Sequence, residues 1–222
     1  MTLPLHLILA AAGRSRRFGQ GDKLLADLNG APVFVHALRR LLPAVTGKCV
    51  IAVPPGRLRE FQEAAFPFTR DLELIWCEGG ACRSEAVRKA IAALGEARGI
   101  VAVHDAARPL ADAPLLGRLY DAALKHGASL PAKAVADTLW RGDAEGGLDA
   151  RVERDGLFAV ETPQLFDVDL WRRAAEKLPG KEFTDDAGLL RAAGFPVALV
   201  LNPEPNFKLT IRSDLDVLRA LI

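Results

Sequence analysis

Residues 5–23 read Leu-His-Leu-Ile-Leu-Ala-Ala-Ala-Gly-Arg-Ser-Arg-Arg-Phe-Gly-Gln-Gly-Asp-Lys, and this segment says most about the architecture. Its apolar part, Leu5 to Ala12, predicts a strand that is buried on both faces, as in parallel sheets. The loop that follows combines the backbone freedom of Gly13, Gly19 and Gly21 with four cations, Arg14, Arg16, Arg17 and Lys23. Backbone N–H groups and cations together favour a polyphosphate ligand over an ordinary solvated loop.

Two common phosphate-binding loops fit this segment poorly. A dinucleotide fingerprint needs two further glycines, and Ser15 and Phe18 stand in their places. A P-loop needs Gly-Lys followed by Ser or Thr, but Lys23 lies between Asp22 and Leu24. We therefore expect a phosphate loop of another pattern.

Composition narrows the class of protein. A chain of 222 residues is long enough for one α/β domain, and its 29 basic and 28 acidic residues nearly cancel. This charge balance disfavours nucleic acid and anionic membranes as partners. The sequence shows neither an apolar run long enough to span a bilayer nor the layout of a signal peptide. Cys49, Cys77 and Cys82 have no metal-binding or disulfide spacing, so we expect reduced thiols and a cytoplasmic location.

Strand-like and helix-like segments alternate along the chain. Strands are predicted over 5–12, 49–53, 72–77, 100–103, 128–135 and 196–201. Helices are predicted from Pro32, over 57–65, after Gly80, around 115–124, over 168–178, over 185–193 with Thr184 as N-cap, and from Ser213. This order predicts a doubly wound, mostly parallel α/β sheet with its sites at the carboxyl ends of the strands.

Residues 137–160 break this alternation. They are polar and strand-like, and glycines punctuate them at 142, 146, 147 and 156. A ribbon of this kind is not stable alone, so it must lie on its own domain or wrap a second subunit. The sequence therefore predicts a single domain over 1–222 that carries a β-arm at 137–160.

Three loops follow strands that point to the same edge of the predicted sheet. They are the loop after the first strand, Gly79-Gly80-Ala81-Cys82-Arg83, and His104-Asp105-Ala106-Ala107-Arg108-Pro109. The carboxyl ends of such strands border one crevice. Arg83 and Arg108 would bring cations to it, and Asp105 a carboxylate that could face a metal ion or a substrate hydroxyl.

On these motifs the chain resembles the 2-C-methyl-D-erythritol 4-phosphate cytidylyltransferases of the non-mevalonate isoprenoid pathway, from Leu9 to about Leu218. The resemblance rests on Ala-Ala-Gly-x-x-x-Arg (11–17) with Lys23, Gly-Gly-x-x-Arg (79–83), His-Asp-Ala-Ala-Arg-Pro (104–109), Asp-Thr (137–138), Thr-Pro-Gln-x-Phe (162–166), Thr-Asp-Asp-Ala (184–187) and Asn-x-Lys-x-Thr (206–210). Seven motifs in one order make it very specific.

The resemblance implies a nucleotidyltransferase-like fold that transfers CMP from CTP to 2-C-methyl-D-erythritol 4-phosphate, releases pyrophosphate and uses Mg²⁺. It implies Arg17 and Lys23 as catalytic cations. The nucleotide would be bound by Ala11, Ala12, Gly13, Gly79, Gly80, Arg83 and Ala106. The acceptor would be bound by Asp105, Arg108, Thr138, Arg154, Thr162, Thr184 and Lys208. No side chain is assigned as a metal ligand, although Asp105 is a candidate.

The resemblance also implies a homodimer, in which the arm carries Thr138 and Arg154 to the partner's site. No general base is needed for the expected reaction. The acceptor is a phosphate monoester with a second pKa of about 6, so it is already largely dianionic at neutral pH. Positioning and charge neutralisation would then carry the reaction.

Some residues depart from the family pattern and keep other functions open. Ser15 stands where many relatives have glycine, Asp22 and Leu24 flank Lys23 in place of proline and glutamine, and Ala86 replaces a serine that contacts the nucleotide. One alternative is a cytidylyltransferase for ribitol 5-phosphate or another polyol or sugar phosphate. An alternative of another class is a catalytically weakened, nucleotide-binding relative.

Overall fold

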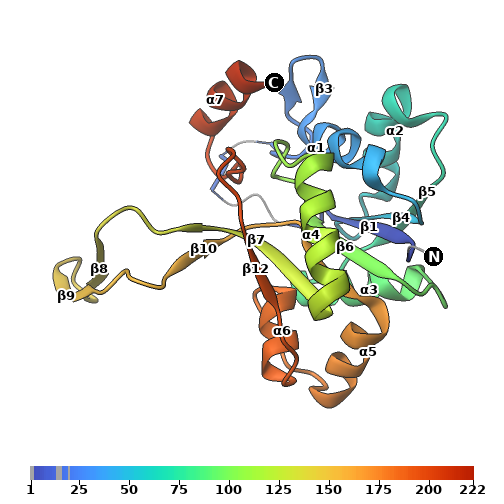
Figure 1. The fold of residues 1–222 in the computed structure, drawn as a ribbon. Helices are drawn as coiled ribbons and strands as arrows, with labels where there is room; N and C mark the ends of the chain where they lie inside the picture. The colour runs from blue at the N-terminus through green and yellow to red at the C-terminus, as the bar shows by residue number, and fades with distance from the viewer. Residues whose placement is uncertain (1–2, 14–16, 20) are drawn as a thin grey trace.

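The computed structural model describes residues 3–13, 17–19 and 21–222, and it shows a central sheet with helices on both faces and one long projection (Figure 1). The strands of the sheet run in the order β10-β7-β11-β6-β1-β4-β5, and β12 pairs with β7. Their bounds are β1 Leu5–Ala10, β4 Cys49–Val53, β5 Leu74–Glu78, β6 Ile100–Asp105, β7 Ala128–Ala134, β10 Phe158–Val160, β11 Gln164–Asp167 and β12 Ala198–Leu201.

Strand β1 lies at the centre of the parallel half of the sheet. It pairs in parallel with β6 on one side and with β4 on the other, and β5 extends the sheet beyond β4. Leu7 is opposite both Ala102 and Cys49, and from Leu5 to Leu9 every residue of β1 is buried. The predicted strand buried on both faces is therefore confirmed, but it ends at Ala10 rather than at the predicted Ala12.

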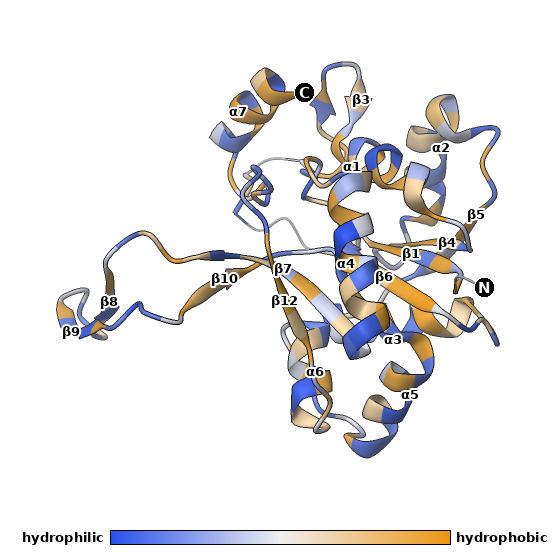
Figure 2. Ribbon diagram, viewed as in Figure 1, coloured by the Kyte–Doolittle hydropathy of each residue, from blue (hydrophilic) through white to orange (hydrophobic). Residues whose placement is uncertain are grey.

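Alternate residues of the strands enter two separate cores. Leu7 and Leu9 pack with α1 (Val33–Leu41), α2 (Leu58–Thr69), α4 (Ala113–His126) and α7 (Ser213–Leu221). Ile8 packs on the other face with α3 (Arg83–Ala93), α5 (Val168–Lys177) and α6 (Asp186–Ala192). The strands are accordingly mostly hydrophobic in Figure 2. The predicted doubly wound sheet is confirmed.

The other half of the sheet is mixed. Strands β10 and β11 run antiparallel to their neighbours, which the alternation of segments does not predict, whereas β12 pairs with β7 in parallel. Strand β11 runs antiparallel to both β6 and β7, and β10 continues along the same side of β7. Strand β12 lies on the opposite side of β7, because Ser129 pairs with both Leu165 and Ala198. Glu161, Thr162 and Pro163 join β10 to β11, and the Thr162–Pro163 peptide is cis.

The projection in Figure 1 is the two-stranded ribbon of β8 (Leu139–Gly142) and β9 (Leu148–Val152). The strands are antiparallel, with Trp140 opposite Arg151, and they pair with each other alone among the described residues. The segment rejoins the sheet at β10, where Phe158 pairs with Ala134. The last three residues of the predicted arm therefore belong to the central sheet.

The cap of α6 and the end of α2 differ from the prediction. Helix α6 is capped by Asp185, whose Oδ1 accepts the N–H of Gly188 at 2.9 Å, whereas the sequence predicts Thr184 as the cap. Helix α2 continues to Thr69 rather than residue 65, with Pro67 inside it. Short elements complete the described chain: β2 (Asp27–Leu28), β3 (Ala31–Pro32) and the 3-10 turn η1 (Leu42–Ala44). Over the described residues, every helix is too short or too polar to cross a bilayer.

Candidate active site

The three predicted loops meet at the carboxyl ends of β1, β5 and β6. They enclose a cavity of about 250 Å³ that is lined by Ala10, Ala12, Gly13, Lys23, Leu24, Ala81, Cys82, Arg83, Ala86, Asp105, Ala107 and Lys208. Six of these residues are among the predicted site residues: Ala12, Gly13, Lys23, Arg83, Asp105 and Lys208. The structure thus brings together residues that are up to about two hundred positions apart in the sequence.

Gly79 allows two of these loops to touch. A Cβ atom at this position would lie 2.6 Å from the Cβ of Ala12 and 3.1 Å from that of Ala86. The N–H of Gly79 donates to the carbonyl of Val53 at 2.7 Å, which fixes the backbone in this close approach. Only glycine fits here, so the loop after β5 forms a narrow slot with the loop after β1.

Asp105 is held by cations from two sides. Its carboxylate accepts from Lys208 Nζ at 2.6 Å and from Arg83 Nε at 3.4 Å, and its backbone N–H donates to Thr162 Oγ1 at 3.0 Å. Burial alone would raise the pKa of Asp105, but Lys208 and Arg83 outweigh it and keep the pKa below its ordinary value. The carboxylate is therefore charged and fixed in direction at neutral pH.

Arg83 is positioned by a second acid. Asp186 accepts from Arg83 Nη1 at 2.8 Å and, through its other oxygen, from Trp171 Nε1 at 3.0 Å. Burial disfavours the charged guanidinium, but Asp186 and Asp105 raise its pKa above the ordinary value. The remaining nitrogen, Nη2, is buried and has no hydrogen-bond partner among the described residues. Arg83 Nη2 is therefore available to donate a hydrogen bond to a ligand in the cavity.

Lys23 lies in a positive environment. Its Nζ donates to the carbonyl of Leu209 at 2.7 Å. Burial lowers its pKa first, the charges of Lys208 and Arg17 lower it further, and Asp105 opposes them. Cations brought this close repel one another, and an anion between them would remove the repulsion. The cavity is therefore suited to phosphate groups.

His104, Thr162 and Arg108 form a hydrogen-bonded group next to Asp105. Thr162 Oγ1 lies 3.1 Å from His104 Nδ1, and His104 Nε2 lies 2.9 Å from the carbonyl of Arg108. Burial lowers the pKa of His104 to about 4, so the ring is neutral at pH 7. Arg108 Nη1 donates to the carbonyl of Asn206 at 2.6 Å. His104 thus joins Thr162 to Arg108.

The remaining predicted site residues do not line this cavity. Ala11, Gly79, Gly80, Ala106 and Thr162 are buried around it, Arg108 is partly buried, and Arg17 and Thr184 are exposed. Thr138 and Arg154 lie at the base of the β8–β9 ribbon and are exposed, and Arg154 Nη1 donates to the carbonyl of Ala136. Arg14, Ser15 and Arg16 fall outside the described residues.

Sequence reasoning missed one link in the site. Gln164 Oε1 accepts from the N–H groups of Asp186 and Ala187 at 3.0 and 3.1 Å, and its Nε2 donates to Asp185 at 3.0 Å. Gln164 therefore fixes the start of α6, and with it the acid that orients Arg83. The motifs Thr-Pro-Gln and Thr-Asp-Asp-Ala are visible in the sequence, but nothing in them indicates that they bind each other.

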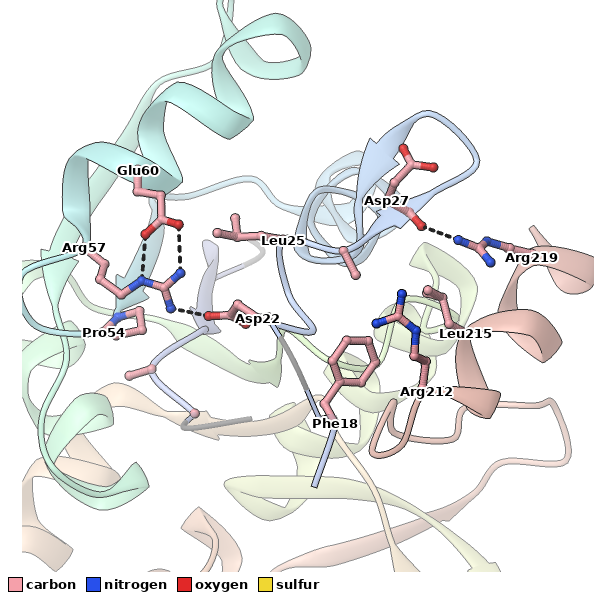
Figure 3. Close-up of a pocket in the computed structure, with 14 residues that line it drawn as sticks. Phe18, Asp22, Leu25, Asp27, Pro54, Arg57, Glu60, Arg212, Leu215 and Arg219 are labelled. Atoms are coloured by element: carbon pink, nitrogen blue, oxygen red, sulfur yellow. Dashed lines mark hydrogen bonds and ion pairs between the residues drawn. The ribbon is translucent and has the colours of Figure 1, made fainter. Parts of the chain in front are cut away.

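A larger cavity of about 870 Å³ shares Ala12 and Gly13 with the first. Figure 3 shows side chains that line this larger cavity. Asp22 lies in the wall of this cavity and pairs with Arg57. Arg57 also donates from Nε and Nη2 to the two carboxylate oxygens of Glu60, at 2.7 and 2.9 Å. Asp22 Oδ1 also accepts the N–H of Leu24 at 2.9 Å. Asp22, the residue before Lys23, is therefore anchored to the start of α2.

Comparison with known proteins decides the family. A family model described as 2-C-methyl-D-erythritol 4-phosphate cytidylyltransferase (IspD) matches residues 5–222. The chain belongs to the IspD family. A Prochlorococcus marinus (strain MIT 9313) protein that bears the name of the family is 34% identical, over 98% of both sequences. The crystal structure of the cytidylyltransferase from Thermus thermophilus superposes with a TM-score of 0.78 at 33% identity and covers 100% of this chain and 98% of that one.

Some relatives, named as bifunctional enzymes, are longer. The bifunctional enzyme IspD/IspF of Maricaulis maris is 39% identical over 96% of this chain but only 56% of its own length. The chain thus spans about half the length of the bifunctional relatives that it matches. Family members are cytidylyltransferases, in agreement with the fold and the positively charged cavity.

Proposed function

We propose that the protein transfers CMP from CTP to 2-C-methyl-D-erythritol 4-phosphate and forms CDP-methylerythritol and pyrophosphate. The observation that supports this best is the cavity itself, in which Lys23, Lys208 and Arg83 surround one fixed carboxylate, Asp105. Cations suit the phosphates of both substrates, and the carboxylate suits the hydroxyl groups of a polyol acceptor.

The nucleotide would occupy the slot between the loops after β1 and β5. The close approach of Gly79 to Ala12 supports this, because it leaves backbone groups rather than side chains to face a flat base. We assign Ala11, Ala12, Gly13, Gly79, Gly80, Arg83 and Ala106 to this half of the site. Arg17 and Lys23 would meet the triphosphate.

The acceptor would lie against the loop after β6. We assign to it Asp105, Arg108, Thr162, Thr184 and Lys208. An oxygen of its phosphate forms a bond to the α-phosphorus of CTP, the bond from that phosphorus to the β-phosphate oxygen breaks, and pyrophosphate leaves. The nucleophile is already charged, so Lys23 and Arg17 act by neutralising charge and Asp105 by orienting hydroxyls.

We also propose a divalent cation such as Mg²⁺. Among the described residues, no cluster of three or more His, Cys, Asp or Glu side chains is placed to hold a metal ion. Mg²⁺ typically binds through one or two carboxylates together with substrate phosphates. Asp105 is the carboxylate in the smaller cavity and fits such a partial set. When bound, the ion would neutralise charge on the triphosphate.

We further propose a homodimer in which the β8–β9 ribbon delivers Thr138 and Arg154 to the acceptor phosphate of the partner's site. Exposed hydrophobic residues lie along this segment, as expected of an interface: Trp140, Leu148, Leu157 and Phe158.

The free thiols Cys49, Cys77 and Cys82 suit a cytoplasmic location.

One observation favours a second function, a nucleotide-binding relative with weak turnover. Ala86 has no hydroxyl group to offer the nucleotide. Ser84 does not replace it, because its Oγ donates to the carbonyl of Phe183 at 2.6 Å and accepts the N–H of that residue at 3.1 Å.

Pyrophosphate release tests both functions. CTP with methylerythritol phosphate should release pyrophosphate faster than CTP with ribitol 5-phosphate, and faster than other nucleoside triphosphates with the same acceptor. A preference for ribitol 5-phosphate would reassign the acceptor. Binding of CTP without release would support the weakened relative.

A further inference from the structure

Glu161 is a buried acid that no part of the proposed reaction uses. It lies between β10 and Thr162, is 7% exposed, and its backbone N–H donates to the carbonyl of Pro131 at 2.9 Å. Its side chain points away from solvent, and a buried carboxylate is kept only where partners compensate for the lost hydration.

Two asparagines supply that compensation. Oε2 of Glu161 accepts from Asn202 Nδ2 at 3.1 Å and from Asn206 Nδ2 at 3.0 Å, and both asparagines are buried. Lys133 Nζ lies 3.9 Å from the other oxygen and is more exposed. One carboxylate oxygen thus bridges the end of β12 and the segment that follows it.

That segment supplies the acceptor half of the site. The side-chain Nδ2 of Asn206 donates to the carbonyl of Thr162 at 2.9 Å, and the backbone carbonyl of Asn206 accepts from Arg108 Nη1. Two residues later Lys208 meets Asp105, and the carbonyl of Leu209 accepts from Lys23. The negative charge of Glu161 also opposes the effect of burial on the pKa of Arg108.

We propose that Glu161 is a positioning residue for the acceptor, and that it acts through Asn202 and Asn206 on Arg108 and Lys208. This rests on the proposed function. The slot between Ala12 and Gly79 has separate supports on β1, β4 and β5. Lys23 also contacts the segment through Leu209, but its loop is held separately by the pairing of Asp22 with Arg57, so loss of Glu161 should affect the acceptor more than the nucleotide.

The test compares Glu161→Gln with Glu161→Gln/Asn202→Asp, in the full-length protein. The single variant removes the charge that both amide groups share, so the KM for methylerythritol phosphate should rise about tenfold while the KM for CTP stays within about twofold. The double variant gives the new amide a carboxylate partner at residue 202 and should recover most of the loss. Lys133→Met keeps both asparagine bonds and should behave as the unaltered protein.

Hydrogen–deuterium exchange provides a second readout that needs no turnover. Glu161→Gln should speed exchange across residues 202–210 and leave 79–87 unchanged. Any one of four results would overturn the inference: equal changes in both KM values, no change in either KM, failure of the double variant to recover, or a uniform change in exchange. An unaltered protein that releases no pyrophosphate would instead reject the proposed function, and the exchange data would still decide the place of Glu161.

Discussion

At the scale of single residues, the tightest constraint in the site is the contact between Gly79 and Ala12. We expect Gly79→Ala to lower the free energy of unfolding by roughly 1–3 kcal/mol, because its Cβ would overlap the Cβ of Ala12. The affinity for CTP should fall with it. Chemical denaturation and calorimetric titration measure the two effects.

Gly117→Ala is the matched control for this change. Gly117 lies within α4, and a Cβ there meets no atom within 4 Å. Alanine should therefore stabilise the helix by about 0.5–1 kcal/mol. If Gly79→Ala proved equally harmless, the proposed slot would not depend on glycine.

The buried ring of His104 makes stability depend on pH. Its folded pKa of about 4 lies below the ordinary value of about 6.5. The unfolded chain therefore binds more protons between these values, so the stabilisation is complete above pH 6.5 and is lost as pH falls toward 4. When the pH falls from 7.5 to 4.5, the unaltered protein should lose about 2–3 kcal/mol more of its unfolding free energy than the His104→Gln variant, which lacks the buried ring. Urea titrations at the two pH values measure it, and equal losses would contradict it.

At the scale of elements, the start of α2 holds the loop that carries Lys23. Arg57 precedes this helix and fixes Asp22, the residue before Lys23. We expect Arg57→Ala to raise the KM for CTP about three- to tenfold with little change in melting temperature, because an anchor of the loop is lost rather than core packing.

Arg59→Ala is a suitable comparison on the same helix. Arg59 also pairs with a glutamate, Glu63, at 2.7 Å, but its side chain is 90% exposed. Such surface pairs contribute little. Steady-state kinetics on both variants, with CTP varied, should separate them, and similar KM values would remove the Arg57 anchor from consideration.

Most elements could be predicted from local pattern, but their relative direction could not. The apolar runs at Cys49–Val53 and Ile100–Val103 predict buried strands, because burial on both faces requires such runs. Strand β11 (Gln164–Asp167) is not among the predicted strands, because its four residues carry no long apolar run, and it returns antiparallel to β6. Its direction depends on pairings with β6 and β7, which no short window of sequence contains.

The candidate site shows the same division. Charged residues that follow buried strands indicated Asp105 and Lys23, whereas Lys208 was predicted from the family motif at 206–210. The bonds of Glu161 to Asn202 and Asn206 span more than forty positions and carry no pattern. They become visible only when β10, β11 and β12 are placed beside β7.

At the scale of the whole molecule, the arm predicts that two chains share each site. Lys23→Ala should lose most turnover while the fold is retained, because one triphosphate cation is missing. Arg154→Ala should raise the KM for the acceptor. If the arm serves the partner's site, a mixture of the two variants contains dimers in which one site is intact. At acceptor concentrations well below the KM of the Arg154→Ala variant, mixing should therefore give more activity than the sum of the separate variants.

The size of the assembly and the rate of subunit exchange must be measured alongside. Light scattering on each variant controls for loss of the dimer. Strictly additive activity after complete exchange would show that Thr138 and Arg154 act within their own chain or not at all.

The three tryptophans of the chain offer optical probes of these events. Trp171 is buried and hydrogen-bonded to Asp186, the acid that holds Arg83, whereas Trp140 is exposed on the ribbon. A ligand that draws Arg83 toward its phosphates would alter the surroundings of the buried indole and change its emission. Burial of the ribbon would shift the emission of the exposed indole to shorter wavelength, so site occupancy and chain association could be followed in one spectrum.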